Sequence, residues 1–330
     1  MAAAALIFVT FSARLQLISD YLLTFAPEIK RNTTMADDSK NKGVFIDEIL
    51  MERERYINPY TDFGFKKLFG TEMNKDLLIS FLNALFNNEE KEIEDVQYLN
   101  SEHLGDGYGD RRAVFDVYCK TKDGGRFIVE MQKAEQTYFK DRSLYYSTFA
   151  IREQAPKGKE WDYHLEDVYA VGILNFRFSE EEYPADRYRH EIKLKDDDDN
   201  HVFYEKLTFV YLEMPKFNKS EDELDTMFDK WMFVLRNLSR LLERPKALQE
   251  RVFKKLFEQA EIAMYTPEER REYEASVKDY WDYFSTMKTA TDKARTEEKT
   301  EIARKMKVDG MPTDIIAKYT GLTINEIEKL

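Results

Sequence analysis

One short stretch constrains the fold of this chain more than any other. Residues 115–133 read FDVYCKTKDGGRFIVEMQK, which is two alternating apolar segments around Asp123-Gly124-Gly125. Aspartate and glycine tolerate the positive φ angles that tight hairpin turns require. The second segment is apolar enough to lie inside a sheet rather than at its edge. The stretch therefore predicts a β-hairpin at the centre of a sheet.

Polar side chains gather on one face of this hairpin. Because neighbouring side chains alternate between faces, Asp116 and Tyr118 are expected on one side, and Phe115, Val117 and Cys119 on the other. On the second strand, by the same rule, the face shared by Ile128, Glu130 and Gln132 is opposite that of Phe127, Val129 and Met131. Three polar groups are thus expected on the Asp116 face.

The loop sets which residues lie opposite one another. A three-residue loop at 123–125 pairs Lys122 with Arg126, and hence Asp116 with Gln132. Asp116 is then diagonal to Glu130, at a backbone separation of about 7–8 Å. Two converging carboxylates form a hard-oxygen site of the kind that Mg²⁺ or Mn²⁺ prefers.

A simpler interpretation is that the hairpin exposes this face to water and carries polar residues there for that reason. Two observations weigh against it. The segment FIVEM at 127–131 is strongly apolar, and an unpaired carboxylate inside a sheet is costly. Aspartate is also disfavoured in strands, so Asp116 among apolar neighbours calls for a reason. The pattern alone leaves both interpretations open.

Six motifs occur in order along the chain, as DFGFKKLFG at 62–70, LLISFLNALF at 77–86, VQYLNSEHLG at 96–105, FDVYC at 115–119, FIVEMQ at 127–132 and RSLYYS at 142–147. From about Asn58 to Phe178 the chain resembles the Rpn family of recombination-promoting nucleases and transposases, in the PD-(D/E)xK nuclease superfamily. The resemblance implies an α/β fold with a restriction-endonuclease-like core, a mixed central sheet flanked by helices.

The resemblance also implies roles for individual residues. It makes Asp116 the metal-binding aspartate and Glu130 the second acid, and it puts Gln132 where the superfamily more often has lysine. We expect Mg²⁺ or Mn²⁺ to be held by Asp116, Glu130, the Met131 carbonyl and Glu102, with Gln132 orienting a water. The expected activity is metal-dependent DNA endonuclease cleavage that leaves 5′-phosphate ends, linked to recombination or mobile elements. A homodimer would supply two active sites.

Charge is distributed in a way that suits this expectation. The whole chain carries 50 Lys and Arg against 63 Asp and Glu, a net charge of −13. Residues 101–160 carry 11 Lys and Arg and 10 Asp and Glu, so the excess of acidic residues lies in the rest of the chain. DNA binding depends on neutralising phosphates, and the candidate phosphate-binding side chains are Arg111, Arg112, Lys133, Lys140 and Arg142.

Two other function classes stay open from sequence. In one, the nuclease fold binds DNA or a partner while catalysis is weak or lost, which the glutamine at 132 favours because it carries no charge. In the other, the chain is an interaction protein of mobile-element biology without DNA contact, which the acidic pI favours. A GxxxxGK[ST] phosphate loop is missing from the sequence, and no nucleotide cofactor is expected. A GxSxG elbow is missing as well, which argues against hydrolase families built on that element. The single Cys119 is expected to pack inertly, and four scattered histidines argue against zinc.

The chain is expected to divide into three parts. Residues 1–50 are expected to form a leader or flexible segment, in which 1–34 are either an upstream mistranslated extension or a flexible leader. The apolar run at 2–9 is too short to span a bilayer. Residues 51–215 form the nuclease-like domain, and 216–330 an α-helical region. We expect a cytoplasmic protein without a membrane span.

Secondary structure follows from periodicity. Helices are expected near 75–86 and 138–153, and strands near 93–100, 113–119, 126–132, 167–176 and 202–213. Further helices are expected at 222–242, 245–264 and 267–307, with Pro245 and Pro267 at their starts.

The last residues, 310–330, have the pattern of two short helices around Thr320-Gly321-Leu322. Thr313 and Thr323 are candidate N-caps, and Gly321 can end the first helix. The pattern resembles a helix-turn-helix, although a small hairpin that docks on the body or on a partner fits equally well, because the second helix is acidic.

Overall fold

The computed structural model describes residues 54–86, 92–103, 113–155, 161–178 and 183–330. Its centre is a six-stranded mixed sheet in the order β1-β4-β5-β6-β8-β7. The strands are β1 (Val96–Tyr98), β4 (Val117–Thr121), β5 (Arg126–Gln132), β6 (Val168–Leu174), β7 (Arg189–Lys195) and β8 (Val202–Glu213). The pairs β5–β6 and β6–β8 are parallel, and the other pairs are antiparallel. A separate two-stranded ribbon joins β2 (Glu102–His103) to β3 (Ala113–Val114).

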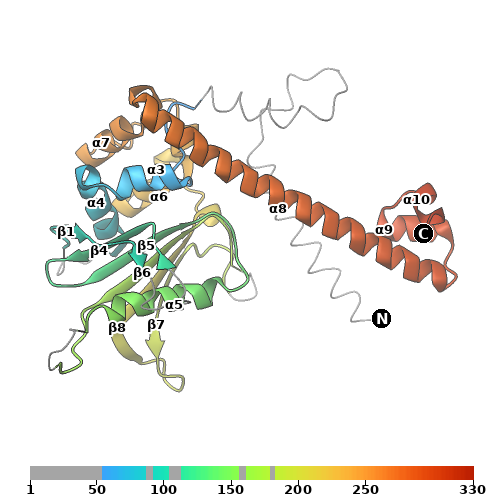
Figure 1. Ribbon diagram of the computed structural model, residues 1–330, viewed down its shortest axis with the longest axis horizontal. Coiled ribbons are helices and arrows are strands. Elements are labelled where there is room, and N and C mark those ends of the chain that lie inside the picture. The colour runs from blue at the N-terminus through green and yellow to red at the C-terminus, as the bar shows by residue number, and fades with distance from the viewer. Residues whose placement is uncertain (1–53, 87–91, 104–112, 156–160, 179–182) are drawn as a thin grey trace. The chain divides into compact units, whose positions relative to one another are not determined.

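Helices cover both faces of the sheet (Figure 1). On one face lies α5 (Phe139–Arg152), whose Phe139 ring packs 5.3 Å from that of Tyr211. On the other face are α3 (Asp62–Phe69), α4 (Lys75–Phe86), α6 (Met227–Asn237) and α7 (Arg251–Ala260). Phe86, at the end of α4, contacts the rings of Phe127 and Tyr169. This arrangement confirms the expected restriction-endonuclease-like α/β fold with a helical C-terminal region.

The central hairpin forms as expected but in a different register. Thr121 and Gly125 are joined by a 2.8 Å backbone hydrogen bond, so the three loop residues are 122–124 rather than 123–125. Gly124 takes the positive φ, +92°. Lys120 therefore pairs with Arg126, and the predicted pairing of Lys122 with Arg126 was wrong by two residues. A shift of two preserves which face each side chain occupies.

Phe115 was assigned to the wrong face. The chain leaves the strand at Phe115 and Asp116, between β3 and β4, which breaks the alternation. The Phe115 ring lies 5.4 Å from that of Tyr118 and belongs to the core beneath α5. The irregularity frees the Asp116 backbone and side chain from ordinary strand pairing, so that both contact β5.

Several elements differ from the expected ones. Strand β7 was not predicted. The expected helix at 222–242 is divided into α6 flanked by the short 3₁₀ turns η4 (Glu221–Glu223) and η5 (Leu238–Arg240), and Pro245 precedes α7 by several residues without starting it. Pro267 does begin α8 (Pro267–Val308), behind the capping box of Thr266 and Glu269. The remaining 3₁₀ turns are η2 (Glu72–Asn74), η3 (Met214–Lys216) and η6 (Ile262–Met264).

Helices α6 and α7 share a core with the N-terminal helices. Trp231 of α6 is fully buried, with its ring 5.7 Å from Phe69, 5.8 Å from Phe81 and 5.1 Å from Phe253. The packing is therefore continuous across residue 215, where a domain boundary was expected, and Glu54–Leu330 forms one compact unit. The expected leader, 1–50, lies outside the described residues.

The tail is a small three-helix packing unit. Ile316 of α9 (Thr313–Thr320) and Ile327 of α10 (Ile324–Glu328) pack against Ala303 of α8. Thr323 and Glu326 form the predicted capping box, and Gly321 ends α9 at a φ of +70°. The N-cap of α9 is Pro312 rather than Thr313. Across the described part of the chain, no helix combines the length and apolarity that a membrane crossing requires.

Candidate active site

Asp116 and Glu130 are held together by the backbone of the hairpin. The Asp116 N–H donates to Glu130 Oε1 at 3.3 Å, and the Met131 N–H donates to Asp116 Oδ2 at 2.7 Å. The Asp116 carboxylate thus accepts a hydrogen bond from the Met131 N–H, a main-chain donor that would otherwise pair with the neighbouring strand. The two acids lie directly across the hairpin rather than diagonally, because of the two-residue change in register.

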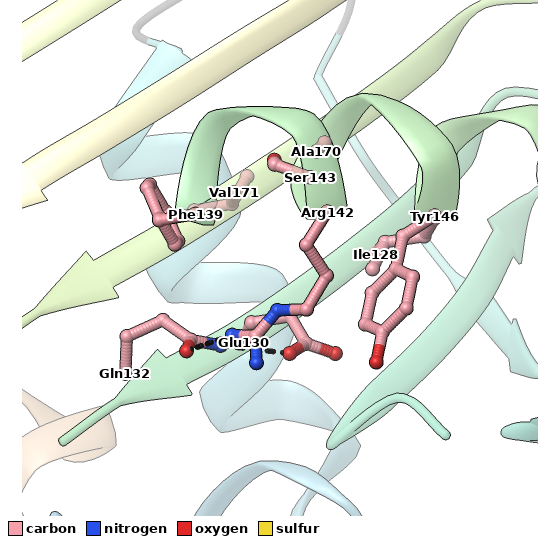
Figure 2. A pocket seen from close by; sticks show the side chains of 10 residues that line it. Ile128, Glu130, Gln132, Phe139, Arg142, Ser143, Tyr146, Ala170 and Val171 are labelled. Carbon is pink, nitrogen blue, oxygen red and sulfur yellow. Dashed lines mark hydrogen bonds between the residues drawn. The ribbon is translucent and has the colours of Figure 1, made fainter. Parts of the chain in front are cut away.

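Gln132 links the acids to helix α5. Its side-chain nitrogen donates to Glu130 Oε2 at 2.9 Å, and its oxygen accepts a hydrogen bond from Arg142 Nη2. Figure 2 shows Arg142 reaching from α5 towards Glu130 and Gln132, with Tyr146 beside it. Arg142 also donates to Gln136, and its guanidinium lies 5.7 Å from the centre of the Tyr146 ring. An acid, an amide and a cation therefore form one connected network.

The network opens onto a small pocket between α5 and strands β5 and β6. It is lined by Ile128, Glu130, Gln132, Phe139, Arg142, Ser143, Tyr146, Ala170, Val171 and Gly172 (Figure 2). Its volume of about 20 Å³ is room for one water molecule or ion. The pocket is too small to hold a sugar or a nucleobase.

Both acids are forced towards their protonated forms. Burial raises the pKa of Glu130 to about 8, and repulsion from Asp116 adds to this, while the charge of Arg142 opposes it. Burial also raises the pKa of Asp116, against the Met131 N–H and the charges of Lys66 and Lys133. Asp116 and Glu130 are two partly buried carboxylates that repel each other, and a bound cation would reduce this repulsion.

The donor set fits a divalent cation with hard-oxygen preference. Mg²⁺ commonly binds through one or two carboxylates and completes its shell with water and substrate phosphate. Asp116 and Glu130 supply two carboxylates. Within the part of the chain that the structure describes, no group of three or more His, Cys, Asp and Glu side chains is placed to hold a metal.

The other predicted site residues are placed as follows. Met131 contacts Asp116 through its N–H, and the Lys133 ammonium lies 6.0 Å from the centre of the Tyr280 ring. Lys140 lies over the rings of Phe178 and Tyr183. Glu102 pairs with Val114 through its backbone, whereas its side chain lies outside the description. Arg111 and Arg112 lie outside the described residues.

Sequence reasoning missed some charged neighbours of the site. Asp62 and Lys66, which form a 2.9 Å ion pair on the first turns of α3, both act electrostatically on Asp116. The motif DFGFKKLFG was noted for the family resemblance, yet nothing in its spacing indicates that α3 approaches the hairpin. Tyr146 lies in the motif RSLYYS but was given no role from the sequence; burial raises the pKa of its hydroxyl, and the charge of Glu130 raises it further.

The family of this chain follows from a comparison over most of its length. A family model described as PD-(D/E)XK nuclease family transposase matches residues 59–290. The chain belongs to this family. The match confirms the resemblance inferred from the six motifs, and it includes Asp116, Glu130, Gln132 and Arg142. The PD-(D/E)XK assignment supports a nuclease-like or transposase-like function for the chain. No curated protein and no solved structure matches the chain.

Proposed function

We propose that this protein is a divalent-metal-dependent DNA endonuclease that hydrolyses phosphodiester bonds. The observation that carries the proposal is the pair of partly buried carboxylates, Asp116 and Glu130, hydrogen-bonded into one network with Gln132 and Arg142. DNA as substrate and a divalent metal as cofactor both follow from the nuclease family. Mg²⁺ is the proposed ion, with Mn²⁺ as its substitute.

In this mechanism Asp116 and Glu130 hold the cation, with the Met131 carbonyl and Glu102 as the further proposed ligands. A bound divalent ion would lower the pKa of a water and offset charge on the phosphate. Gln132 orients the water through its amide, which can donate and accept hydrogen bonds. Arg142 holds a non-bridging phosphate oxygen, a geometry for which guanidinium is suited. Arg111, Arg112 and Lys133 are proposed to hold neighbouring phosphates.

The direct test is to incubate the protein with supercoiled plasmid in Mg²⁺, in Mn²⁺ and in EDTA. We expect relaxed or linear plasmid with either metal, intact plasmid with EDTA, and 5′-phosphate ends on the products. Asp116→Ala and Glu130→Ala should each lower the cleavage rate by about 10²-fold or more. Parent-level cleavage by both variants would exclude these acids as the site. Linear product at low turnover would support a dimer that carries two sites.

A second candidate function is DNA or partner binding by a nuclease fold with weak or no catalysis. It is favoured by Gln132, which offers only a dipole and whose oxygen is already bonded to Arg142. A DNA gel shift in EDTA distinguishes this candidate. Retarded DNA without cleavage in any metal would favour the binding module, and no retardation together with no cleavage would favour a protein-interaction role.

A further inference from the structure

The parallel strands bring three chain segments to one edge of the sheet. At the carboxyl end of β5 the Gln132 carbonyl accepts a hydrogen bond from Asn175 N–H at 2.9 Å. At the end of β6, Leu174 pairs with Glu213 of β8. Residues that follow β6 and β8 therefore emerge beside the catalytic network. Ligands of α/β sheets commonly bind outside the carboxyl ends of parallel strands.

Two arginines converge at this edge from different elements. Arg177 follows β6, and its Nη2 donates to the Pro215 carbonyl at 3.2 Å. Arg236 belongs to the last turn of α6, and its Nη1 donates to the Asn218 side-chain oxygen at 2.9 Å. Pro215 and Asn218 are three residues apart just after β8. The two guanidinium groups therefore lie against the same short segment.

This convergence is electrostatically unfavourable as it stands. In the described part of the chain neither Arg177 nor Arg236 forms an ion pair with a carboxylate, and each donates to a neutral oxygen. Arg240, on η5, has contacts of its own, and its positive charge also acts on Arg236. Burial lowers the pKa of Arg236, and the charges of Arg240 and Arg177 lower it further, against an opposing contribution from Tyr60. A half-buried cation among like charges calls for an anion.

The Arg177 and Arg236 side chains can both still bind an anion. A guanidinium has five N–H donors, of which the described contacts use one in each arginine. A guanidinium with unused N–H donors can bind two oxygens of a phosphate at once. Strands β5 and β8 are two positions apart in the sheet, about 10 Å. The backbones of these two strands are thus separated by roughly the rise of three nucleotides along one DNA strand.

We propose that Arg177 and Arg236, with Arg240 beside them, form a second phosphate site that holds the DNA backbone a few nucleotides from the bond cleaved at Asp116 and Glu130. The inference rests on the proposed function for its ligand. It assigns a binding role to residues from β6, α6 and η5, all far in sequence from the catalytic hairpin. Neutralising these arginines should weaken DNA binding while leaving the chemical step intact.

The test measures DNA affinity without relying on cleavage. Fluorescence anisotropy of a labelled 20-base-pair duplex, titrated in EDTA at several salt concentrations, gives Kd and its salt dependence. Arg177→Gln/Arg236→Gln should bind about 10- to 100-fold more weakly at low salt, with the slope of log K against log salt smaller by about 2. The matched control is Lys120→Gln/Lys195→Gln, which removes two charges at the opposite edge, near the amino ends of β5 and β8. The control should remain within about threefold of the parent.

Further variants separate the alternatives. Arg177→Lys/Arg236→Lys keeps both charges, so the slope of log K against log salt should equal that of the parent. A variant that failed to fold would not keep this slope. Equal Kd and slope in the parent and the glutamine pair would overturn the proposal, as would a parent that does not bind the duplex. Protection of the parent against thermal unfolding by inorganic phosphate, with no change in the DNA slope, would assign the arginines to a free phosphate ion and would also overturn it. If the glutamine pair weakens binding but no protein cuts plasmid, the phosphate site stands and the endonuclease proposal fails.

Discussion

Glu130 lies directly opposite Gly172 on the neighbouring parallel strand. A Cβ at position 172 would come within 2.9 Å of Tyr211 Cδ1 and 3.3 Å of Leu174 Cδ2. The Tyr211 hydroxyl in turn donates to Ser143 Oγ at 2.8 Å, one residue from Arg142 on α5. The missing side chain at 172 therefore lets Tyr211 and α5 pack closely around the site.

Gly172→Ala should thus destabilise the fold and displace Arg142. Overpacking of this kind costs about 1–3 kcal/mol of unfolding free energy, and thermal unfolding measures it. Plasmid cleavage should fall as well, because α5 carries Arg142. Tyr211→Phe is the control, since it keeps the ring and removes only the hydroxyl. An unfolding temperature for Gly172→Ala equal to that of the parent would mean that the Tyr211 ring moves aside at no cost.

Glu130 should make the stability of the metal-free protein depend on pH. Its pKa is raised to about 8 in the folded protein, from 4.5 for an ordinary glutamate. The folded state then holds a proton that the unfolded chain releases, so the unfolding free energy falls as pH rises from about 4.5 to 8. Glu130→Gln lacks this titration. In EDTA it should unfold at a higher temperature than the parent at pH 8.5, with the gap closing towards pH 4.5.

Metal should reverse the order of the unfolding temperatures of the parent and Glu130→Gln. Mg²⁺ should stabilise the parent at pH 8, because the carboxylate binds the cation in its ionised form. The glutamine variant should gain much less. Glu135→Gln, which removes an exposed carboxylate nearby, should follow the parent in both buffers. Identical pH profiles for Glu130→Gln and the parent would show that Glu130 is ionised in the folded state without metal.

Deletion of residues 310–330 should leave the nuclease core folded. Among the described residues, Ile316 and Ile327 pack in a small cluster with Ala303 and Met306 of α8 and with neighbouring tail residues. Residues 285–298 of α8, between this cluster and the body, are exposed. The unfolding temperature of the core should therefore remain within about 2 °C of the parent. Ile316→Asp, which disrupts the same cluster in place, should behave like the deletion. A large loss of stability in both variants would mean that the tail supports the core.

The same deletion tests the role of the tail. If the tail contacts DNA, its loss should weaken the gel shift without altering metal dependence. An unchanged shift at several salt concentrations would assign the tail to protein contact instead.

The sequence predicted the faces of the hairpin better than its register. Asp123-Gly124-Gly125 and Lys122-Asp123-Gly124 are both plausible three-residue loops. The hydrogen bond from Thr121 to Gly125 selects the second, in which Gly124, with its positive φ, occupies the last loop position. The slip of two residues did not matter for the faces, since side chains alternate with a period of two. The Glu130 and Gln132 side chains therefore share a face as expected, and Arg142 joins them.

Other features were not predicted from the sequence. Strand β7 reads RHEIKLK, in which charged and apolar residues alternate over 191–195, so its pattern was present but overlooked; its charge is typical of edge strands, which avoid pairing with other chains in this way. Gly172 faces Glu130 only because β6 runs parallel to β5 after a helical crossover. The approach of Asp62 and Lys66 to Asp116 is likewise set by the packing of α3, which local pattern does not encode.

Gln132 is the residue at which this chain departs from the commoner superfamily pattern, and substitution there tests what the amide does. It donates to Glu130 and accepts from Arg142, so it positions its neighbours without adding charge. Gln132→Leu removes both hydrogen bonds at similar volume and should lower plasmid cleavage by about 10- to 100-fold, the effect of losing one orienting group. Gln132→Lys supplies a cation near both acids and should maintain or raise cleavage if chemistry limits the rate.

The lysine variant carries its own internal control. A cation at 132 repels Arg142, which now bonds to the glutamine oxygen, so Gln132→Lys combined with Arg142→Gln separates that repulsion from the effect on the acids. Cleavage by Gln132→Lys below the parent but restored in the double variant would locate the loss at Arg142. Full cleavage by Gln132→Leu would contradict an orienting role and leave the chemistry to Asp116, Glu130 and the metal.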